Sequence, residues 1–314
     1  MGIQVGALGP EAIVDSIVRL SGELLREGLP SDGFPPTLFH FTDAAGLVGI
    51  LTDRCFRASR ARCMNDAGEV SYAVRLAKEI LEEGSDRARS DMRQAASRYL
   101  DPQNIESHIR LEIDPFVVSF CSSGSESSQW LHYGRGGDGY ALGFDADGLR
   151  PAADLIKVIY DRDQQRSTLT RIIDAIEERA MTLIRKLPSE DAEGGVEAAA
   201  QLLAITIWGK APWMKDPAFK SENEWRLVLL ERRGQMIQPQ KNGLKPFYRV
   251  SGNKIVPYYE LSDLRGGKRK ISLKSITVGS KVDFNLARSS ITHLLSNLGF
   301  DESTPIGRSS VPLQ

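Results

Sequence analysis

The chain has 314 residues, 41% of them hydrophobic, which is enough to bury one large core or two modest ones. Its formal net charge is -1, so overall electrostatics indicate neither a nucleic-acid nor a membrane partner. Three cysteines are too few and too widely spaced for a disulfide framework or a four-ligand zinc site. No apolar run approaches the roughly 18 residues that span a bilayer. We therefore expect a cytoplasmic protein without signal peptide, lipid anchor or membrane contact.

The first predicted helix begins at Pro10, a favourable residue for a first helical turn. Apolar residues recur along it at helical spacing, and Gly28 ends the pattern. Residues 30–36 are rich in Pro, Gly, Ser and Asp, which is typical of a linker. We predict that residues 1–35 form an N-terminal helical appendage with a linker and that residues 36–314 form a single domain.

Short strands and helices are predicted to mix along the rest of the chain. Strands are expected at residues 37–42, 115–121, 140–144, 155–160, 224–231, 246–250, 255–261 and 271–278. Helices are expected at residues 43–51, from Asp66 to Gly84, over 86–100, from Ser125 through Tyr133, as two long helices over 163–209, and at 284–298. Several strands follow one another as hairpins. This favours an α+β fold with mixed, largely antiparallel sheets, flanking helices and a helical insertion at about 163–209.

His40 and Thr42 are the first candidate site residues. Alternation along a strand places them on one face, with Phe39 and Phe41 on the other. Two hydrogen-bonding side chains in front of buried aromatic rings form a plausible ligand-orienting pair. The structural alternative is that Thr42 or Asp43 caps the next helix and that His40 has a structural role.

An arginine-rich stretch follows, in which Arg54, Arg57, Arg60 and Arg62 lie within nine residues and precede Asn65. Guanidinium groups bind phosphates through forked hydrogen bonds, so this stretch is a candidate phosphate site. A solvent-exposed edge strand is the alternative.

A third candidate segment contains Ser128, Trp130 and Tyr133, followed by a glycine-rich turn. Hydroxyl groups at a helix start can bind an anion together with free backbone amides, and the aromatic rings could stack on a flat ligand. Against this, Trp and Tyr at this spacing are more often core residues. The glycines also lack the spacing of a dinucleotide-binding fingerprint or a P-loop.

The fourth candidate segment is Ser-Glu-Asn-Glu-Trp-Arg, which begins at residue 221. A period of two places Glu222, Glu224 and Arg226 on one face and Trp225 on the other. Two carboxylates this close are expected to raise each other's pKa, which suits a group that gains or loses a proton. An exposed edge with a Glu–Arg pair is the alternative. No HExxH motif, histidine cluster or cysteine pair indicates a metal site.

Taken in order, these segments resemble a bacterial family known as domain of unknown function two-nine-seven-one. The resemblance runs from about Leu38 to Val278 and rests on an ordered series of short motifs. These are Leu-Phe-His-Phe-Thr, Ala-Ser-Arg-Ala-Arg-Cys-Met-Asn-Asp, Phe-Val-Val-Ser-Phe-Cys-Ser, Ser-Gln-Trp-Leu-His-Tyr-Gly, Gly-Tyr-Ala-Leu-Gly-Phe-Asp and Phe-Lys-Ser-Glu-Asn-Glu-Trp-Arg.

That family is in turn distantly similar to the ADP-ribosyltransferase superfold, which has a split sheet. There, a ligand-orienting His lies on one strand and a catalytic Glu on a later one, and His40-x-Thr42 and Glu222-x-Glu224 match these elements. The resemblance implies that NAD, as substrate, loses nicotinamide while Glu224 stabilises the ribose cation and Glu222 serves an unknown protein, nucleic-acid or water acceptor.

The resemblance further implies that Thr42, Arg60, Arg62, Asn65, Ser128, Trp130, Tyr133 and Arg226 bind NAD, and by analogy with bacterial members it suggests a toxin or phage-defence role. Two other functions stay open. One is a non-catalytic module that binds a nucleotide or a partner. The other is a metal-dependent hydrolase or nuclease that uses the carboxylates with His40. The sequence does not define the oligomeric state.

Overall fold

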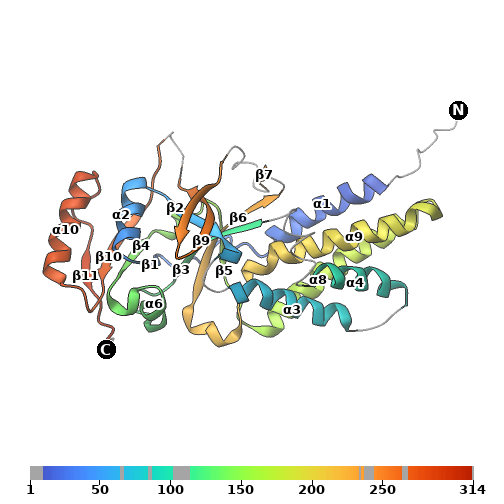
Figure 1. The fold of residues 1–314 in the computed structure, drawn as a ribbon, viewed down its shortest axis with the longest axis horizontal. Helices are drawn as coiled ribbons and strands as arrows, with labels where there is room; N and C mark the ends of the chain where they lie inside the picture. Colours follow the sequence, from blue (N-terminus) through green and yellow to red (C-terminus); the bar gives the residue numbers. More distant parts are fainter. Residues whose placement is uncertain are drawn as a thin grey trace.

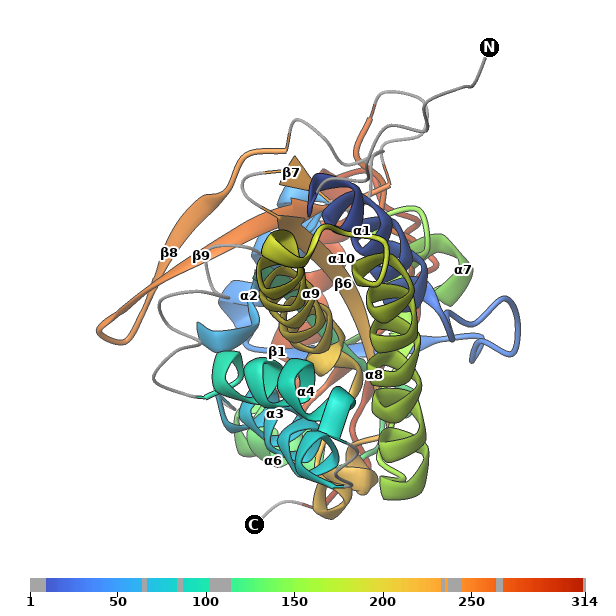
Figure 2. The same cartoon turned by 90° about the vertical axis from the view of Figure 1, so that its right-hand side faces the viewer.

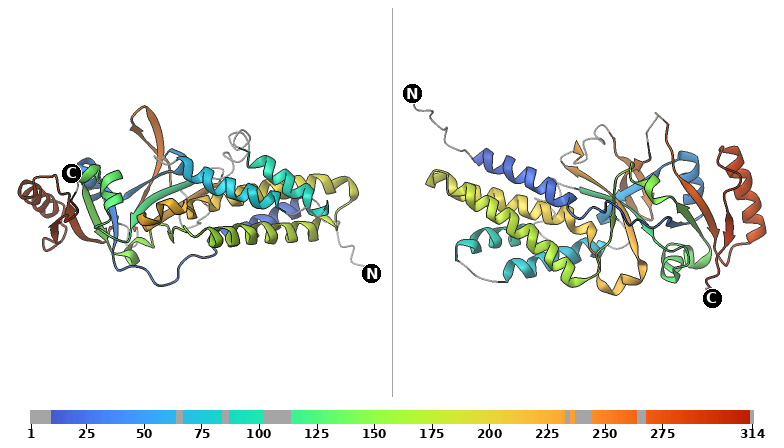
Figure 3. Two further views of the ribbon diagram at one scale, coloured as in Figure 1. Left: turned by 90° about the horizontal axis from the view of Figure 1, so that it is seen from below. Right: turned by 180° about the vertical axis from the view of Figure 1, so that it is seen from behind.

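A branched sheet lies in the middle of an elongated molecule, between a helical bundle at one end and helix α10 at the other (Figures 1 and 3). The computed structural model describes residues 10–63, 67–83, 87–101, 114–232, 235–236, 244–263 and 268–312. None of the described helices combines the length and apolarity needed to cross a lipid bilayer.

The described elements follow the predicted order closely. The strands are β1 Leu38–Thr42, β2 Phe56–Arg60, β3 Asp114–Cys121, β4 Tyr140–Phe144, β5 Asp154–Lys157, β6 Glu224–Arg232, β7 Gln235–Met236, β8 Phe247–Ser251, β9 Lys254–Leu261, β10 Leu273–Val278 and β11 Ile306–Arg308. The α-helices are α1 Pro10–Arg26, α2 Ala44–Asp53, α3 Ala67–Glu82, α4 Arg87–Tyr99, α6 Ser127–His132, α7 Ala146–Leu149, α8 Arg162–Ile184, α9 Ser189–Lys210 and α10 Phe284–Asn297. Short 3-10 helices include η5 Pro217–Glu222.

The strands form one sheet in the order β11-β10-β4-β1-β3-β2-β9-β8, and β6 joins it on β3 and carries β5 and β7. The pair β10–β11 is parallel, and the other described strand pairs are antiparallel. Helices cover the sheet without the regular strand–helix alternation of doubly wound folds. The predicted α+β class with a mixed, largely antiparallel sheet is therefore confirmed.

The sheet divides at β3. Along one edge, β3 pairs with β6 from Asp114 to Cys121. Its other edge is shared: β2 pairs with β3 at Ser59 and Arg60, and β1 pairs with it only at Phe39. Because β1 and β2 diverge from the same edge of β3, a gap opens between them.

The two faces of β3 pack against different cores. Val117 belongs to the core of the helical bundle, whereas Phe116, Val118 and Phe120 belong to the core beneath α2 and α10. Alternation along a strand explains this division. Residues of α1 share the bundle core with α8 and α9, and Figure 2 shows these helices side by side. The division of the chain at residue 35 stays a prediction.

Candidate functional site

A cavity of about 650 Å³ lies at the gap between β1 and β2. It brings together residues that are far apart in the sequence. The lining includes His40 and Thr42 from β1, Tyr133 after α6, and Glu222 and Glu224 at the start of β6. All four residues of the two predicted pairs thus border one space.

His40 is held in one defined tautomer. Its Nδ1 lies 2.9 Å from the backbone oxygen of Ser119, and because a carbonyl only accepts, Nδ1 must carry the proton. Burial lowers the pKa of His40, and the hydrogen bond to Ser119 offsets only part of this effect. The imidazole is therefore neutral near pH 7, and Nε2 presents a lone pair that can accept a hydrogen bond from a ligand.

Thr42 stands where β1 passes into α2. The helix is capped by its neighbour Asp43, whose side chain accepts a hydrogen bond from the backbone N–H of Gly46 at 2.8 Å. Asp43 also accepts a hydrogen bond from Arg135 at 2.7 Å. Helix capping is thus the task of Asp43, and Thr42 lines the cavity.

Glu224 is buried in a network of donors. Its two oxygens each accept a bond of 2.8 Å from Arg226, and Lys215 Nζ lies 3.4 Å from Oε2. The hydroxyl of Ser119 also bonds to this carboxylate. Burial raises the pKa of Glu224, but Arg226 and Lys215 outweigh burial, so its pKa lies below the ordinary value. The expectation of a raised pKa is wrong for Glu224, because Arg226 and Lys215 supply more positive charge than Glu222 supplies negative charge.

Glu222 ends η5 and is 5% exposed. Its Oε2 lies 2.5 Å from Lys215 Nζ, so Lys215 lies between the two carboxylates. Asn223 has a left-handed backbone, with φ 44°, and this reverses the chain between them. The four side chains Lys215, Arg226, Glu222 and Glu224 carry two positive and two negative charges in a buried cluster.

Ser119 connects the two halves of the site, since its carbonyl accepts from His40 and its hydroxyl bonds to Glu224. Neither Ser119 nor Lys215 was predicted as a site residue from the sequence. Ser119 had a weak signal, because it is the one hydroxyl inside the apolar run Phe116–Phe120. Lys215 had none, because it lies in the segment between α9 and η5 without any pattern around it.

The strand register places His40 and Glu224 on opposite faces of the sheet. Cys121 pairs with both Phe39 and Glu224, so these three side chains share a face, and His40 points to the other. Both residues still reach the cavity, because β1 separates from β3 beyond Phe39 and the cavity occupies that gap. A ligand that contacts both must therefore enter the gap itself.

Two residues of the third candidate segment do not line this cavity. Trp130 is completely buried: its ring packs edge-on against Phe41, with centroids 5.2 Å apart, and its Nε1 donates to the Gly124 carbonyl. The prediction that Trp130 stacks on a ligand is wrong, because its ring is part of the core. Ser128 donates to Glu126 at 3.4 Å, outside the cavity lining. The ring of this segment that reaches the cavity belongs to Tyr133.

The predicted phosphate site at Arg60 and Arg62 is also corrected. Both guanidinium groups form ion pairs with the buried Asp114, and neither residue lines the cavity. Their charge serves to compensate an internal carboxylate. Asn65 lies outside the described residues. Arg226 likewise is a counter-ion to Glu224 and not a lining residue.

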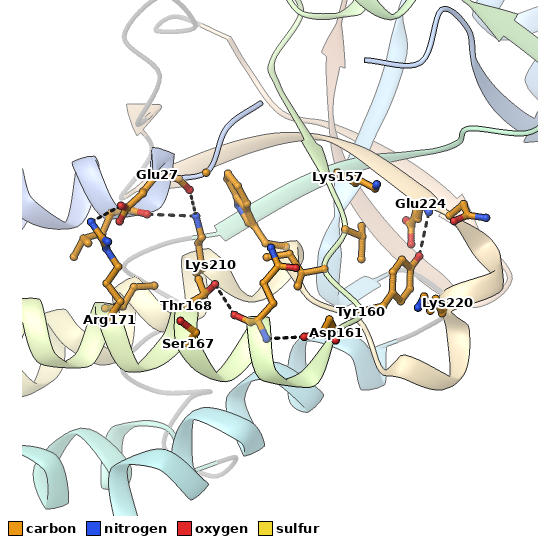
Figure 4. Close-up of a pocket in the computed structure, with 18 residues that line it drawn as sticks. Glu27, Lys157, Tyr160, Asp161, Ser167, Thr168, Arg171, Lys210, Lys220 and Glu224 are labelled. Atoms are coloured by element: carbon orange, nitrogen blue, oxygen red, sulfur yellow. Dashed lines mark hydrogen bonds and ion pairs between the residues drawn. The ribbon is translucent and has the colours of Figure 1, made fainter. Parts of the chain in front are cut away.

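A second cavity of about 600 Å³ lies on the bundle side of Glu224 (Figure 4). The Tyr160 hydroxyl accepts a hydrogen bond of 3.1 Å from the backbone N–H of Glu224, which lines both cavities. Deeper in, Lys210 Nζ donates to the carbonyls of Leu24, Leu25 and Glu27, at the C-terminal end of α1. Lys210 thus fastens α1 to α9.

Among the described residues, the side chains close enough to share a metal ion are Asp53, Cys55 and Glu260. Asp53 pairs with Arg57 at 3.1 Å and Glu260 with Arg269 at 2.5 Å, while burial raises the pKa of the Cys55 thiol to about 11. Cationic partners and a protonated thiol disfavour metal binding at this cluster.

These features define an α+β protein with a ligand-sized cavity in a branched sheet. A family model described as a protein of unknown function (DUF2971) matches residues 129–227. Over this segment, from α6 into β6, the chain is similar to that family, and the match is shorter than the resemblance predicted from Leu38 to Val278. Tyr133, Glu222 and Glu224 lie within it. No curated protein and no solved structure matches the chain.

Proposed function

We propose that this protein binds NAD in the cavity between β1 and β2 and cleaves the bond between nicotinamide and ribose, passing ADP-ribose to an acceptor. The supporting observation is that one cavity is lined by His40, Thr42, Tyr133 and the pair Glu222 and Glu224. A histidine, an aromatic ring and carboxylates around one space suit the recognition of a ribose that carries a flat base.

Each side chain has a distinct role in this proposal. Nε2 of His40 accepts a hydrogen bond from a ribose hydroxyl, and the Tyr133 ring stacks on nicotinamide. The glycosidic bond breaks with its electron pair going to the nicotinamide nitrogen, which leaves positive charge on the ribose. Glu224, kept ionised by Arg226 and Lys215, stabilises that charge. The acceptor attacks the ribose carbon and passes its proton to Glu222.

A second function is favoured by a specific observation. Glu224 already accepts from Arg226, Lys215 and Ser119, which uses most of its capacity as an acceptor. A carboxylate engaged in this way is less able to grip a ribose hydroxyl. This favours a module that binds a nucleotide without turnover, and for such a module NAD would raise the melting temperature but stay intact.

The test is to incubate the purified protein with NAD and quantify free nicotinamide by chromatography. We expect release by the native protein and none by Glu224→Gln. His40→Asn keeps an N–H donor for the Ser119 carbonyl and removes the Nε2 acceptor, so it should reduce release at least tenfold. His293→Asn, on the exposed face of α10, is the matched control and should release nicotinamide at the native rate.

Melting temperatures separate loss of function from loss of fold in these variants. If NAD stabilises the native protein but stays intact with varied acceptors, the binding module is the correct function. If NAD neither changes the melting temperature nor is consumed, both functions are refuted. A bacterial toxin or phage-defence role in the cytoplasm belongs to the same proposal and rests on analogy alone.

A further inference from the structure

Arg249 gives the cavity a positive group at the end farthest from the glutamates. It lies on β8, in the β8–β9 hairpin that projects from the sheet (Figure 2), and it lines the cavity. Its Nη2 donates to the Ser59 hydroxyl at 3.1 Å. In the part of the chain that the structure describes, no carboxylate lies within ion-pair distance of this guanidinium. Arg249 therefore brings to the cavity lining a guanidinium that no described carboxylate neutralises.

Arg57 on β2 adds a second guanidinium to the same end of the cavity. It pairs with the partly exposed Asp53 at 3.1 Å and lies over the Tyr258 ring, 5.4 Å from the centroid. The hydrogen bond between Arg57 and Asp53 is exposed to solvent, so the pair is weak and leaves Arg57 able to contribute to an anion site.

The register places these groups on the face that carries Glu224. Ser59 pairs with Val117 and with Tyr258, and Cys121 pairs with Glu224. Residues two apart on a strand share a face of the sheet. One face therefore carries the side chains of Arg57, Ser59, Ser119 and Glu224. Arg249 pairs with Val256, which lies two residues before Tyr258, and joins the same face. This face thus runs from arginines through serine hydroxyls to carboxylates.

The order of charges restricts the ligand. From Arg249 on β8 to Glu224 on β6, this face crosses four strand spacings, which is about 19 Å between the backbones of the two outermost strands. A phosphate is attracted by Arg249, whereas Lys215 and Arg226 already neutralise Glu222 and Glu224, to which a sugar hydroxyl can donate. A ligand that spans this face is therefore expected to carry its negative charge at the Arg249 end and hydroxyl groups at the other end.

We propose that Arg249, with Ser59 and Arg57, binds the diphosphate of a nucleotide in this cavity. Forked guanidinium donors suit the oxygens of a diphosphate. Arg57 belongs to the arginine-rich stretch for which the sequence predicts phosphate binding, whereas Arg249 takes the role that was predicted for Arg60 and Arg62. The choice of NAD as the complete ligand rests on the proposed function, but diphosphate binding does not require turnover.

The test compares ADP and adenosine by isothermal titration calorimetry on the full chain. ADP should bind the native protein, Arg249→Gln should weaken ADP binding at least tenfold, and Arg57→Gln should weaken it at least threefold. Adenosine binding should change less than twofold in both variants, because it has no phosphate. Lys254→Gln, the same change of charge on β9 of the same hairpin, is the matched control and should bind ADP like the native protein.

Three results would overturn the proposal. One is native-like ADP binding by Arg249→Gln with an unchanged melting temperature. Another is an equal loss of ADP and adenosine binding, which would indicate a general disturbance of the cavity. The third is failure of the native protein to bind ADP. Failure of the proposed function alone looks different: ADP binding would depend on Arg249 while no nicotinamide is released.

Discussion

Replacing Arg226 by methionine removes the guanidinium that faces Glu224 but keeps an unbranched side chain in the same buried space. Arg226 is 4% exposed and Glu224 is 3% exposed, and two bonds of 2.8 Å join them. The change also removes the bond from Arg226 Nη1 to the Pro212 carbonyl. Loss of one partner of a buried ion pair costs about 3–5 kcal/mol. Because Lys215 stays beside Glu224 in the variant, we expect a loss of about 3 kcal/mol at neutral pH.

The same variant has a predicted pH dependence. Without Arg226, burial dominates and raises the pKa of Glu224 above its unfolded value. The contribution of Glu224 to the stability of the variant is then fully present below the unfolded pKa and is lost as pH rises through the folded pKa. In the native protein the pKa of Glu224 is lowered, so stability is present above the unfolded pKa and lost as pH falls. The difference in free energy of unfolding between the two proteins should therefore grow with rising pH, starting below about 4.3, the ordinary value for glutamate, and continuing above it.

Urea-induced unfolding gives the free energy of unfolding by linear extrapolation. A double variant, Glu224→Gln with Arg226→Met, leaves Lys215 balanced by Glu222 and should be more stable than Arg226→Met alone. Coupling between the two changes should exceed about 1 kcal/mol. If the two losses add within about 0.5 kcal/mol and the loss from Arg226→Met is independent of pH, the described charge cluster is wrong.

Two further predictions concern packing and titration. A Cβ at Gly46 would lie 1.9 Å from Thr42 Oγ1, so Gly46→Ala should lower the free energy of unfolding by about 1–3 kcal/mol, measured by thermal melting. In the same helix, a Cβ at Gly49 would meet nothing within 4 Å, so Gly49→Ala should be neutral or stabilising. Equal effects of the two substitutions would contradict this packing. Burial lowers the pKa of Lys210 to about 7, so between pH 7 and 10 the unfolded chain binds a proton that the folded chain has released. Relative to Lys210→Met, the native free energy of unfolding should then rise with pH, by up to about 4 kcal/mol. Parallel pH profiles of the two proteins would refute this.

Local pattern was sufficient to predict much of the fold. Alternation placed Phe39 and Phe41 opposite His40, and both aromatic rings pack with the cluster around Trp130. The predicted strand at residues 140–144 is β4. These features depend on residues within a few positions of one another, where periodicity carries the information.

The site was harder to predict because its chemistry depends on contacts across the sheet. Asp114, on another strand, forms ion pairs with both Arg60 and Arg62, so this part of the arginine-rich stretch is not free to bind phosphate. Arg249, which reaches the cavity, comes from a late hairpin with no motif of its own. Arg226 was expected on the face of Glu224, but the consequence for pKa was missed because two carboxylates were considered without their cations.

The most direct test of the central claim is a crystal structure of the protein with ADP-ribose. We predict a ligand in the cavity between β1 and β2, with a ribose hydroxyl within hydrogen-bond distance of His40 Nε2 and the diphosphate at Arg249. A ligand bound instead in the second cavity, between Lys157 and Lys220, would contradict the account.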